Sequence, residues 1–368
     1  MSDAPEDDDG DPEDPDDVVD DGDLFPVGSA AAGRRGSIDY GETSHLAADG
    51  TPRIVERRLV VPPELAGLRL DHFIKTQISR LSRTKIQTII DTQLTRIGND
   101  GRLKPATSVI AGETFVIRRP ARAEPACPRT FDVLHEDARV RVIDKPAGLP
   151  VHASAKFYFN TLTRVLWERY PDEPELQICH RLDRETSGCL VVARDRDAAS
   201  IIKTAIADKR KTTKQYLAIV HGQPPWDREV TLDAALRLSQ KTDATRVPGV
   251  RVLVDEAHGA EAATRVVVVR RNSDYALVRC TLVTGRQHQI RVHLAHAGFP
   301  IVGDKLYAHG DDAFVAFCDG GMTPELAARF VLPRHALHAS SIELPHPDGG
   351  RLRAEAPLPA ELGALVPG

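Results

Sequence analysis

The residues with the greatest potential for chemistry are concentrated in one stretch, from His180 to Gly188, which reads HRLDRETSG. The stretch combines an imidazole, guanidinium groups, carboxylates and hydroxyls, which is more reactive chemistry than a plain connection needs. Asp183 lies near its centre, between Arg181 and Arg184. Asp183 is therefore the candidate catalytic group. The alternative is that these three charged residues form only a local ion-pair cluster.

Short apolar runs flank this stretch and indicate how it is held. Leu176 to Cys179 precedes it, and Cys189 to Ala193 follows it. Apolar runs of this length with β-branched residues, bounded by polar turns, are typical of strands. We therefore expect the reactive stretch to be a loop between two strands.

Two later segments also present reactive side chains on regular elements. The alternating sequence from Lys214 to Gly222 predicts a strand that carries Tyr216. The segments 263–269 and 275–283, joined by a polar turn, predict an antiparallel hairpin. The sequence after the hairpin, 284–296, predicts a helix that carries Arg291 and ends before a glycine.

Three histidines near Arg291 raise the question of zinc. His288 and His293 are five residues apart and do not share a helical face, whereas His293 and His296 share a face but lack a third ligand nearby. The sequence therefore predicts no metal site.

Four motifs in order resemble those of the RluA-type pseudouridine synthases, which isomerise uridine in RNA. They are K-P-x-G-x-x-V-H at 145–152, H-R-L-D-x-x-T-S-G at 180–188, K-x-Y-x-A-x-V-x-G at 214–222 and R-x-H-Q-I-R-x-H at 286–293. The resemblance implies an α+β fold with mixed, largely antiparallel sheets around a cleft. It covers roughly residues 130–360, and we expect residues 130–368 to form the catalytic domain.

The resemblance also implies roles for particular residues. Asp183 matches the nucleophile of the family, Arg291 matches the arginine that pairs with it, and Tyr216 matches the tyrosine that lies over the target base. Arg181 matches the residue that fills the gap left by a flipped base, and we expect His180 beside it to contact the substrate.

The expected reaction is chemically self-contained. Uridine is rejoined to its ribose through ring carbon 5 with nothing added or oxidised, so no cofactor is expected. Arg291 should keep Asp183 ionised and can grip both oxygens of a carboxylate. The hydroxyl of Tyr216 could remove the proton from carbon 5, although its ordinary pKa of about 10 argues against this role.

Residues 54–120 predict a smaller domain with two helices, the second capped by Ser82, and a final strand. It resembles the RNA-binding domain named after ribosomal protein S-four, and we expect Arg69, Arg83 and Lys85 to form a basic rim for phosphates. The alternative is an adaptor that packs on the larger domain. A linker at 121–129, rich in proline and charge, should follow.

Charge is divided unevenly along the 368 residues. Residues 1–50 hold 16 acidic residues against two arginines, a net charge of −14, which leaves +9 for the rest. We expect a disordered acidic tail at 1–50, which serves solubility or competes for the basic surface that RNA would bind. The sequence shows neither a signal segment nor a long apolar run, which predicts a cytoplasmic protein. Its five cysteines are scattered, which predicts reduced thiols.

The expected partner is RNA, with ribosomal RNA of the large subunit favoured over transfer RNA, and the expected state is a monomer without membrane contact. One rival is a noncatalytic RNA-binding factor for ribosome assembly. Another is a glycosidase, which would need a second carboxyl group such as that of Glu185 as its acid.

Overall fold

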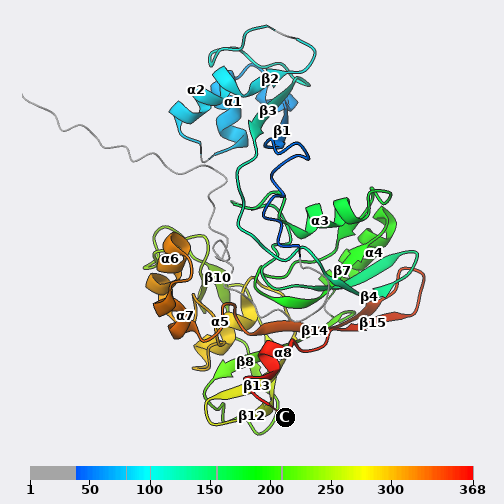
Figure 1. The fold of residues 1–368 in the computed structure, drawn as a ribbon, viewed down its shortest axis with the longest axis vertical. Helices are drawn as coiled ribbons and strands as arrows, with labels where there is room; N and C mark the ends of the chain where they lie inside the picture. The colour runs from blue at the N-terminus through cyan, green and yellow to red at the C-terminus, as the bar shows by residue number, and fades with distance from the viewer. Residues whose placement is uncertain (1–38, 80, 100, 155, 209, 368) are drawn as a thin grey trace, which may run out of the picture. The chain divides into compact units, whose positions relative to one another are not determined.

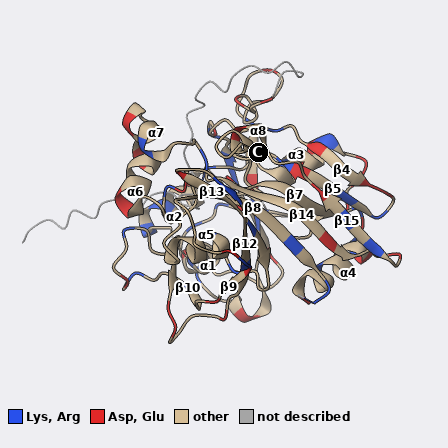
Figure 2. Cartoon of the chain, turned by 90° about the horizontal axis from the view of Figure 1, so that it is seen from below, with Lys and Arg blue, Asp and Glu red and all other residues tan. Residues whose placement is uncertain are grey.

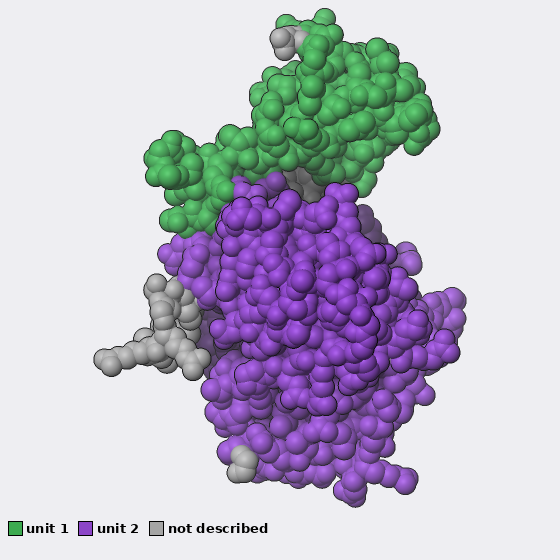
Figure 3. Space-filling model, turned by 90° about the vertical axis from the view of Figure 1, so that its right-hand side faces the viewer, with its two compact units in different colours: residues 1–18, 43–124, 154–156 green, residues 19–42, 125–153, 157–368 purple. Residues whose placement is uncertain are grey.

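The computed structural model describes residues 39–367 except 80, 100, 155 and 209. These residues divide into two compact units, which Figure 3 colours separately. The smaller unit consists mainly of residues 43–124, and the larger consists mainly of residues 125–153 and 157–367. None of the helices described is long and apolar enough to cross a membrane.

The smaller unit packs two helices on a three-stranded antiparallel sheet of order β1-β3-β2 (Figure 1). Ser82 caps the second helix as expected, because its hydroxyl accepts a hydrogen bond from the backbone N–H of Lys85 at 3.2 Å. Phe73, Ile74 and Phe115 are fully buried between the helices and the sheet. The elements are β1 (Ile54–Val60), η1 (Pro63–Leu65), α1 (Leu70–Gln77), α2 (Arg83–Thr92), β2 (Leu94–Arg96) and β3 (Thr114–Pro120).

The larger unit is built on a ten-stranded sheet of order β4-β5-β7-β14-β8-β13-β12-β9, with β15 on β14 and β6 on β7. The β7–β14 pair is parallel and the other pairs are antiparallel. The expected α+β fold with a mixed, largely antiparallel sheet is therefore confirmed. The strands are β4 (Asp132–Glu136), β5 (Val140–Lys145), β6 (Gln177–Ile178), β7 (Ser187–Ala193), β8 (Thr213–His221), β9 (Val230–Leu232), β12 (Thr264–Arg271), β13 (Tyr275–Leu282), β14 (Leu337–Pro345) and β15 (Arg351–Glu355).

Helices and a small second sheet complete the larger unit. β10 (Leu236–Leu238) and β11 (Val252–Val254) pair with each other. The helices are α3 (Leu162–Arg169), α4 (Arg196–Ala207), α5 (Gln289–His296), α6 (Gly310–Gly320), α7 (Pro324–Phe330) and α8 (Ala360–Gly363). Figure 2 shows basic and acidic positions interspersed over β4, β5 and β15, where pairs such as Arg351 with Glu343 offset one another.

The parallel contact between β7 and β14 depends on one glycine. Gly188 has φ of +111°, and a Cβ atom at this position would lie 2.2 Å from the carbonyl oxygen of Ala339 on β14. Only glycine tolerates this backbone conformation and this close approach. The reactive loop therefore enters the sheet at a fixed place.

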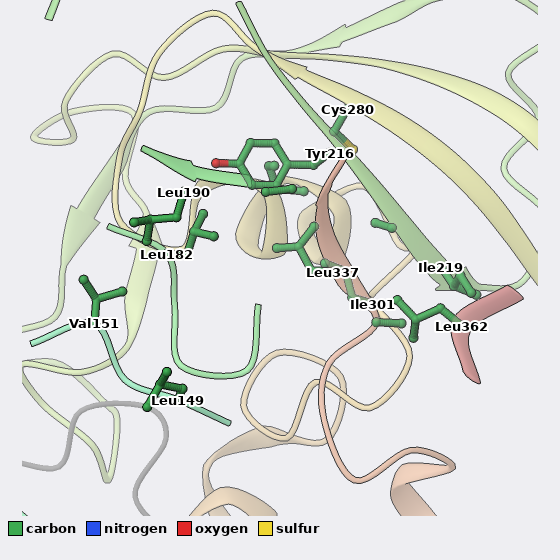
Figure 4. Close-up of a cluster of buried hydrophobic side chains, with 14 of the residues drawn as sticks. Leu149, Val151, Leu182, Leu190, Tyr216, Ile219, Cys280, Ile301, Leu337 and Leu362 are labelled. Carbon is green, nitrogen blue, oxygen red and sulfur yellow. The ribbon is translucent and has the colours of Figure 1, made fainter. Parts of the chain in front are cut away.

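The apolar core beneath the loop comes from several strands (Figure 4). Leu182 of the loop, Leu190 of β7, Tyr216 of β8, Cys280 of β13 and Leu337 of β14 are all buried in one cluster. Burial of apolar surface is the main favourable contribution to folding. Leu182, the residue before Asp183, is thus part of the core that holds the sheet together.

Two expectations require correction at element boundaries. The helix expected over 284–296 begins only at Gln289, because His288 has φ of +52° and the side chain of Gln289 is bonded back to Thr284 and to the N–H of Arg286. The expected loop ends at Thr186, since Ser187 and Gly188 already belong to β7.

The acidic tail was predicted to extend to residue 50. Residues 1–38 lie outside the described part of the chain. Residues 39–50 do not fit the prediction of disorder, because the backbone oxygens of Asp39 and Tyr40 accept hydrogen bonds from Arg129 and Cys127, and Gly41 accepts one from Asn160. These contacts provide backbone partners that composition alone does not reveal.

Candidate active site

A pocket of about 380 Å³ in the larger unit is lined by the loop before β7, the start of β8 and the segment that leads into α5. It contains Asp183, Tyr216 and Arg291, together with His180 and Arg181. The tertiary structure thus brings five of the expected site residues to one cavity, although they are distributed over more than one hundred positions of sequence. The remaining three belong to the smaller unit.

Arg291 links two carboxylates. Its Nη1 lies 3.1 Å from Oδ2 of Asp183, and its Nε and Nη2 donate to the two oxygens of Asp304 at 2.7 and 3.1 Å. We expected Arg291 to grip both oxygens of Asp183, but the fork formed by its Nε and Nη2 grips those of Asp304. A bidentate pair fixes the plane of a guanidinium, so Asp304 orients the group that meets Asp183.

Asp304 is fully buried yet ionised. Burial would raise its pKa, but the Arg291 guanidinium and the backbone N–H of Tyr307 outweigh burial and hold the pKa below its usual value. No role was assigned to Asp304 from the sequence. The sequence does hold a signal for a structural role of Asp304, because it follows Gly303 and precedes Tyr307 by three positions. An Asp in such a turn accepts hydrogen bonds from nearby backbone N–H groups.

The part of the loop that follows Asp183 is held by hydrogen bonds from other segments. The Arg184 carbonyl accepts from the N–H of Gly148 at 2.8 Å and from Nζ of Lys145 at 3.1 Å. The Thr186 hydroxyl is 2.8 Å from Nε2 of His335. The turn at 145–148, which begins the K-P-x-G-x-x-V-H motif, therefore holds the reactive loop, as preorganisation of a site requires.

Lys145 is also coupled electrically to the site. Burial and the nearby Arg334 lower the pKa of Lys145 to about 7, while the charge of Asp183 opposes this change. Its Nζ donates to the carbonyls of Pro146 and Leu149 as well as to that of Arg184. A buried ammonium needs such partners because desolvation disfavours its charge.

Glu185 faces away from the chemistry proposed for Asp183. Its Oε1 is 2.7 Å from Nζ of Lys305, and its Oε2 accepts from the backbone N–H of His335 at 2.9 Å. Glu185 is buried and does not line the pocket. It therefore serves as a structural ion pair and is poorly placed to protonate a leaving group, as the glycosidase alternative requires.

Tyr216 is 7% exposed and projects from β8 into the pocket wall. Burial and the charge of Asp183 raise its pKa above its ordinary value. The hydroxyl therefore stays protonated near neutral pH, which counts against a phenolate base. The ring remains available as an apolar surface for a base.

His180 and Arg181 differ in environment. Burial and Lys214 lower the pKa of His180 well below 6.5, and its Nε2 accepts from the N–H of Val191 at 3.1 Å. His180 is thus neutral with its proton on Nδ1. The side chain of Arg181 is exposed at the pocket, where an incoming polyanion can reach it.

The histidines considered for zinc have other partners. Nδ1 of His288 lies 2.8 Å from the hydroxyl of Tyr307, and both ring nitrogens of His293 are bonded, to Thr264 and to the carbonyl of Ala234. No group of three or more His, Cys, Asp or Glu in the described part of the chain could hold a metal ion.

The basic rim expected on the smaller unit is altered by one ion pair. The guanidinium of Arg69 donates to both oxygens of Asp71, at 3.1 and 2.7 Å, which offsets its charge. Arg83 is exposed and Lys85 half-buried in the first turn of α2. A phosphate contact by these residues remains a prediction.

Comparison with known proteins identifies relatives over most of the chain. Residues 139–296 match the family model described as RNA pseudouridylate synthase. Ribosomal large subunit pseudouridine synthase D of Neisseria meningitidis serogroup A is 33% identical over 340 residues, which are 89% of this chain and 85% of that protein.

Two further proteins are similar. Ribosomal large subunit pseudouridine synthase C of Escherichia coli K12 is 33% identical over 312 residues, which are 82% of this chain and 92% of that protein. Among solved structures, human RNA pseudouridylate synthase domain containing 4 is 28% identical and covers 62% of this chain and 89% of its own, with a TM-score of 0.49.

Proposed function

Because this chain belongs to the RNA pseudouridylate synthase family, we propose that it converts uridines of large-subunit ribosomal RNA into pseudouridine, with Asp183 as the nucleophile. The observation that supports this assignment best is the 3.1 Å contact between Asp183 and an Arg291 whose fork is fixed by Asp304. The names of the similar bacterial proteins support ribosomal RNA as the substrate. Transfer RNA is the second candidate.

The reaction breaks the bond between ribose carbon 1′ and ring nitrogen 1, turns the ring, and joins carbon 1′ to ring carbon 5. The proton on carbon 5 leaves, and a proton is gained at nitrogen. Attack by the carboxylate of Asp183, on either the ribose or the ring, divides this change into easier steps. Arg291 favours the ionised carboxylate that the attack needs.

The other groups position the base. The ring of Tyr216 offers an apolar face to uracil, and the neutral His180 lines the same pocket. A base inside an RNA fold must leave its stack to reach this pocket. Arg181, exposed at the pocket, is suited to occupy the vacated position.

The rival functions fit the site less well. A noncatalytic assembly factor would have no use for the buried arrangement of Asp183, Arg291 and Asp304. A glycosidase would need a second carboxyl group as its acid. Glu185, the candidate for this role, is paired with Lys305 and does not line the pocket. Product analysis separates these functions, because a glycosidase releases uracil and a synthase conserves it. We expect the enzyme to act as a monomer in the cytoplasm without a cofactor.

The decisive experiment maps pseudouridines across all RNAs of a strain that lacks this protein. Specific positions in large-subunit ribosomal RNA should lose pseudouridine and regain it when the wild-type protein, but not Asp183→Asn, is supplied. Loss confined to transfer RNA would contradict the proposed substrate. An unchanged map would contradict the proposed activity.

A further inference from the structure

A second pocket, of about 280 Å³, adjoins the active-site pocket within the larger unit. We call it the flanking pocket. The two pockets share the four residues Ile206, Lys214, Leu282 and Gly285, so they are continuous across one wall. The flanking pocket is also lined by Ala207, Thr212, Val283 and Thr284.

The flanking pocket presents an apolar surface. Ile206 and Leu282 are half-buried, and Val283 at its edge is 40% exposed. Its hydroxyls are already bonded within the protein, since Thr212 donates to the carbonyl of Ala205 and Thr284 to the side chain of Gln289. Such a surface suits the flat face of a base better than a group that needs hydrogen bonds.

Lys214 supplies the charge in this wall. In the part of the chain that the structure describes, its ammonium has no hydrogen-bond or ion-pair partner. Burial lowers the pKa of Lys214 to about 8, and Cys179 opposes this change. A half-buried lysine without a carboxylate gains from an incoming anion, and a phosphate is the anion that RNA brings.

We propose that the flanking pocket binds the nucleotide next to the target uridine, and that Lys214 holds the phosphate that joins the two nucleotides. A uridine that enters beside Asp183 remains joined to the nucleotides on either side of it. At the wall that contains Lys214, the RNA strand can continue from the active-site pocket into the flanking pocket. The base is read there by shape and apolar contact. This inference rests on the proposed RNA substrate.

The test uses a short RNA that the enzyme modifies, with a neutral methylphosphonate at the linkage on one side or the other of the target uridine. At one of the two linkages the change should weaken binding to the wild-type enzyme by about tenfold, the size of one charged contact. Lys214→Met should bind the unmodified RNA about as weakly and show no further loss with that methylphosphonate.

Two variants serve as controls. Lys214→Arg should retain the sensitivity to the methylphosphonate. Lys203, which is exposed on α4, donates to Gln177 and lines neither pocket, so Lys203→Met should keep the wild-type sensitivity. If the losses from Lys214→Met and from each methylphosphonate simply multiply, Lys214 does not contact either phosphate and the proposal is wrong.

A second test addresses the base. Ala207→Trp should fill the flanking pocket from its exposed edge. An abasic nucleotide beside the target should weaken binding to the wild-type enzyme and have no effect on Ala207→Trp. Equal effects on both proteins would overturn the flanking pocket. Pseudouridine formation by the wild-type enzyme in the same RNA reports separately on the proposed function.

Discussion

Two carboxylates contact Arg291, and replacing each by an amide should affect a different property. Asp304→Asn should lower stability, whereas Asp183→Asn should lower turnover. Asp304 is 0% exposed and holds the Nε–Nη2 fork, whereas Asp183 is 18% exposed and is reached through Nη1. Asp304→Asn leaves a guanidinium that is 3% exposed without its main counter-charge. Breaking a buried ion pair in this way costs about 3–5 kcal/mol of unfolding free energy.

Asp183→Asn should cost much less stability, because Arg291 keeps Asp304 as a partner. We expect a change of less than about 1 kcal/mol, as for partly exposed pairs. The amide cannot act as a nucleophile, so turnover should fall far more than tenfold, a change in barrier well above about 1.4 kcal/mol. RNA binding should survive, since the shape of the side chain is kept.

Urea unfolding measures the stability of both variants, and release of tritium from carbon 5 of labelled uridine in RNA measures turnover. The matched pair controls for simple loss of one negative charge beside Arg291. A loss below about 1 kcal/mol in Asp304→Asn, or turnover of Asp183→Asn within about tenfold of wild type, would refute the roles assigned here.

Four other outcomes are expected. Arg291→Lys should lose most activity, since a point charge cannot hold Asp304 through two donors; near-normal turnover would count against the pairing. Tyr216→Phe keeps the ring and should still allow the glycosidic bond to break; slower tritium release would show that the hydroxyl takes part in proton loss at carbon 5 despite its raised pKa, and wild-type release would remove the hydroxyl from the mechanism. His338 is buried with a pKa lowered to about 4, so protonation of the unfolded chain below about pH 6.5 should reduce stability by about 2 kcal/mol between pH 7 and pH 5. His338→Gln should flatten that part of the pH profile in urea unfolding, and an unchanged slope would exclude His338. Arg83→Ala combined with Lys85→Ala should weaken binding of long RNA while turnover of a short RNA is unchanged; equal affinity for long RNA would favour an adaptor role.

The sequence alone determined local structure, both around the site and in the smaller unit. The apolar runs beside His180 and the alternation around Tyr216 specify strands, and Ser82 specifies a helix start, because these signals depend on neighbours a few residues away. The ordered motifs also indicated the family, because four short stretches of this sequence matched its residue types in the expected order. The comparisons confirmed that prediction.

Only the tertiary structure decided which charges meet. Asp183 and Arg291 are 108 positions apart, and the fork to Asp304 depends on how α5 packs after the chain turns at His288. The order of residues 39–50 and the offset of Arg69 by Asp71 likewise depend on partners that periodicity does not specify. Such long-range pairs form only when distant strands come together in one buried sheet. No short window of sequence carries the information on which strands meet.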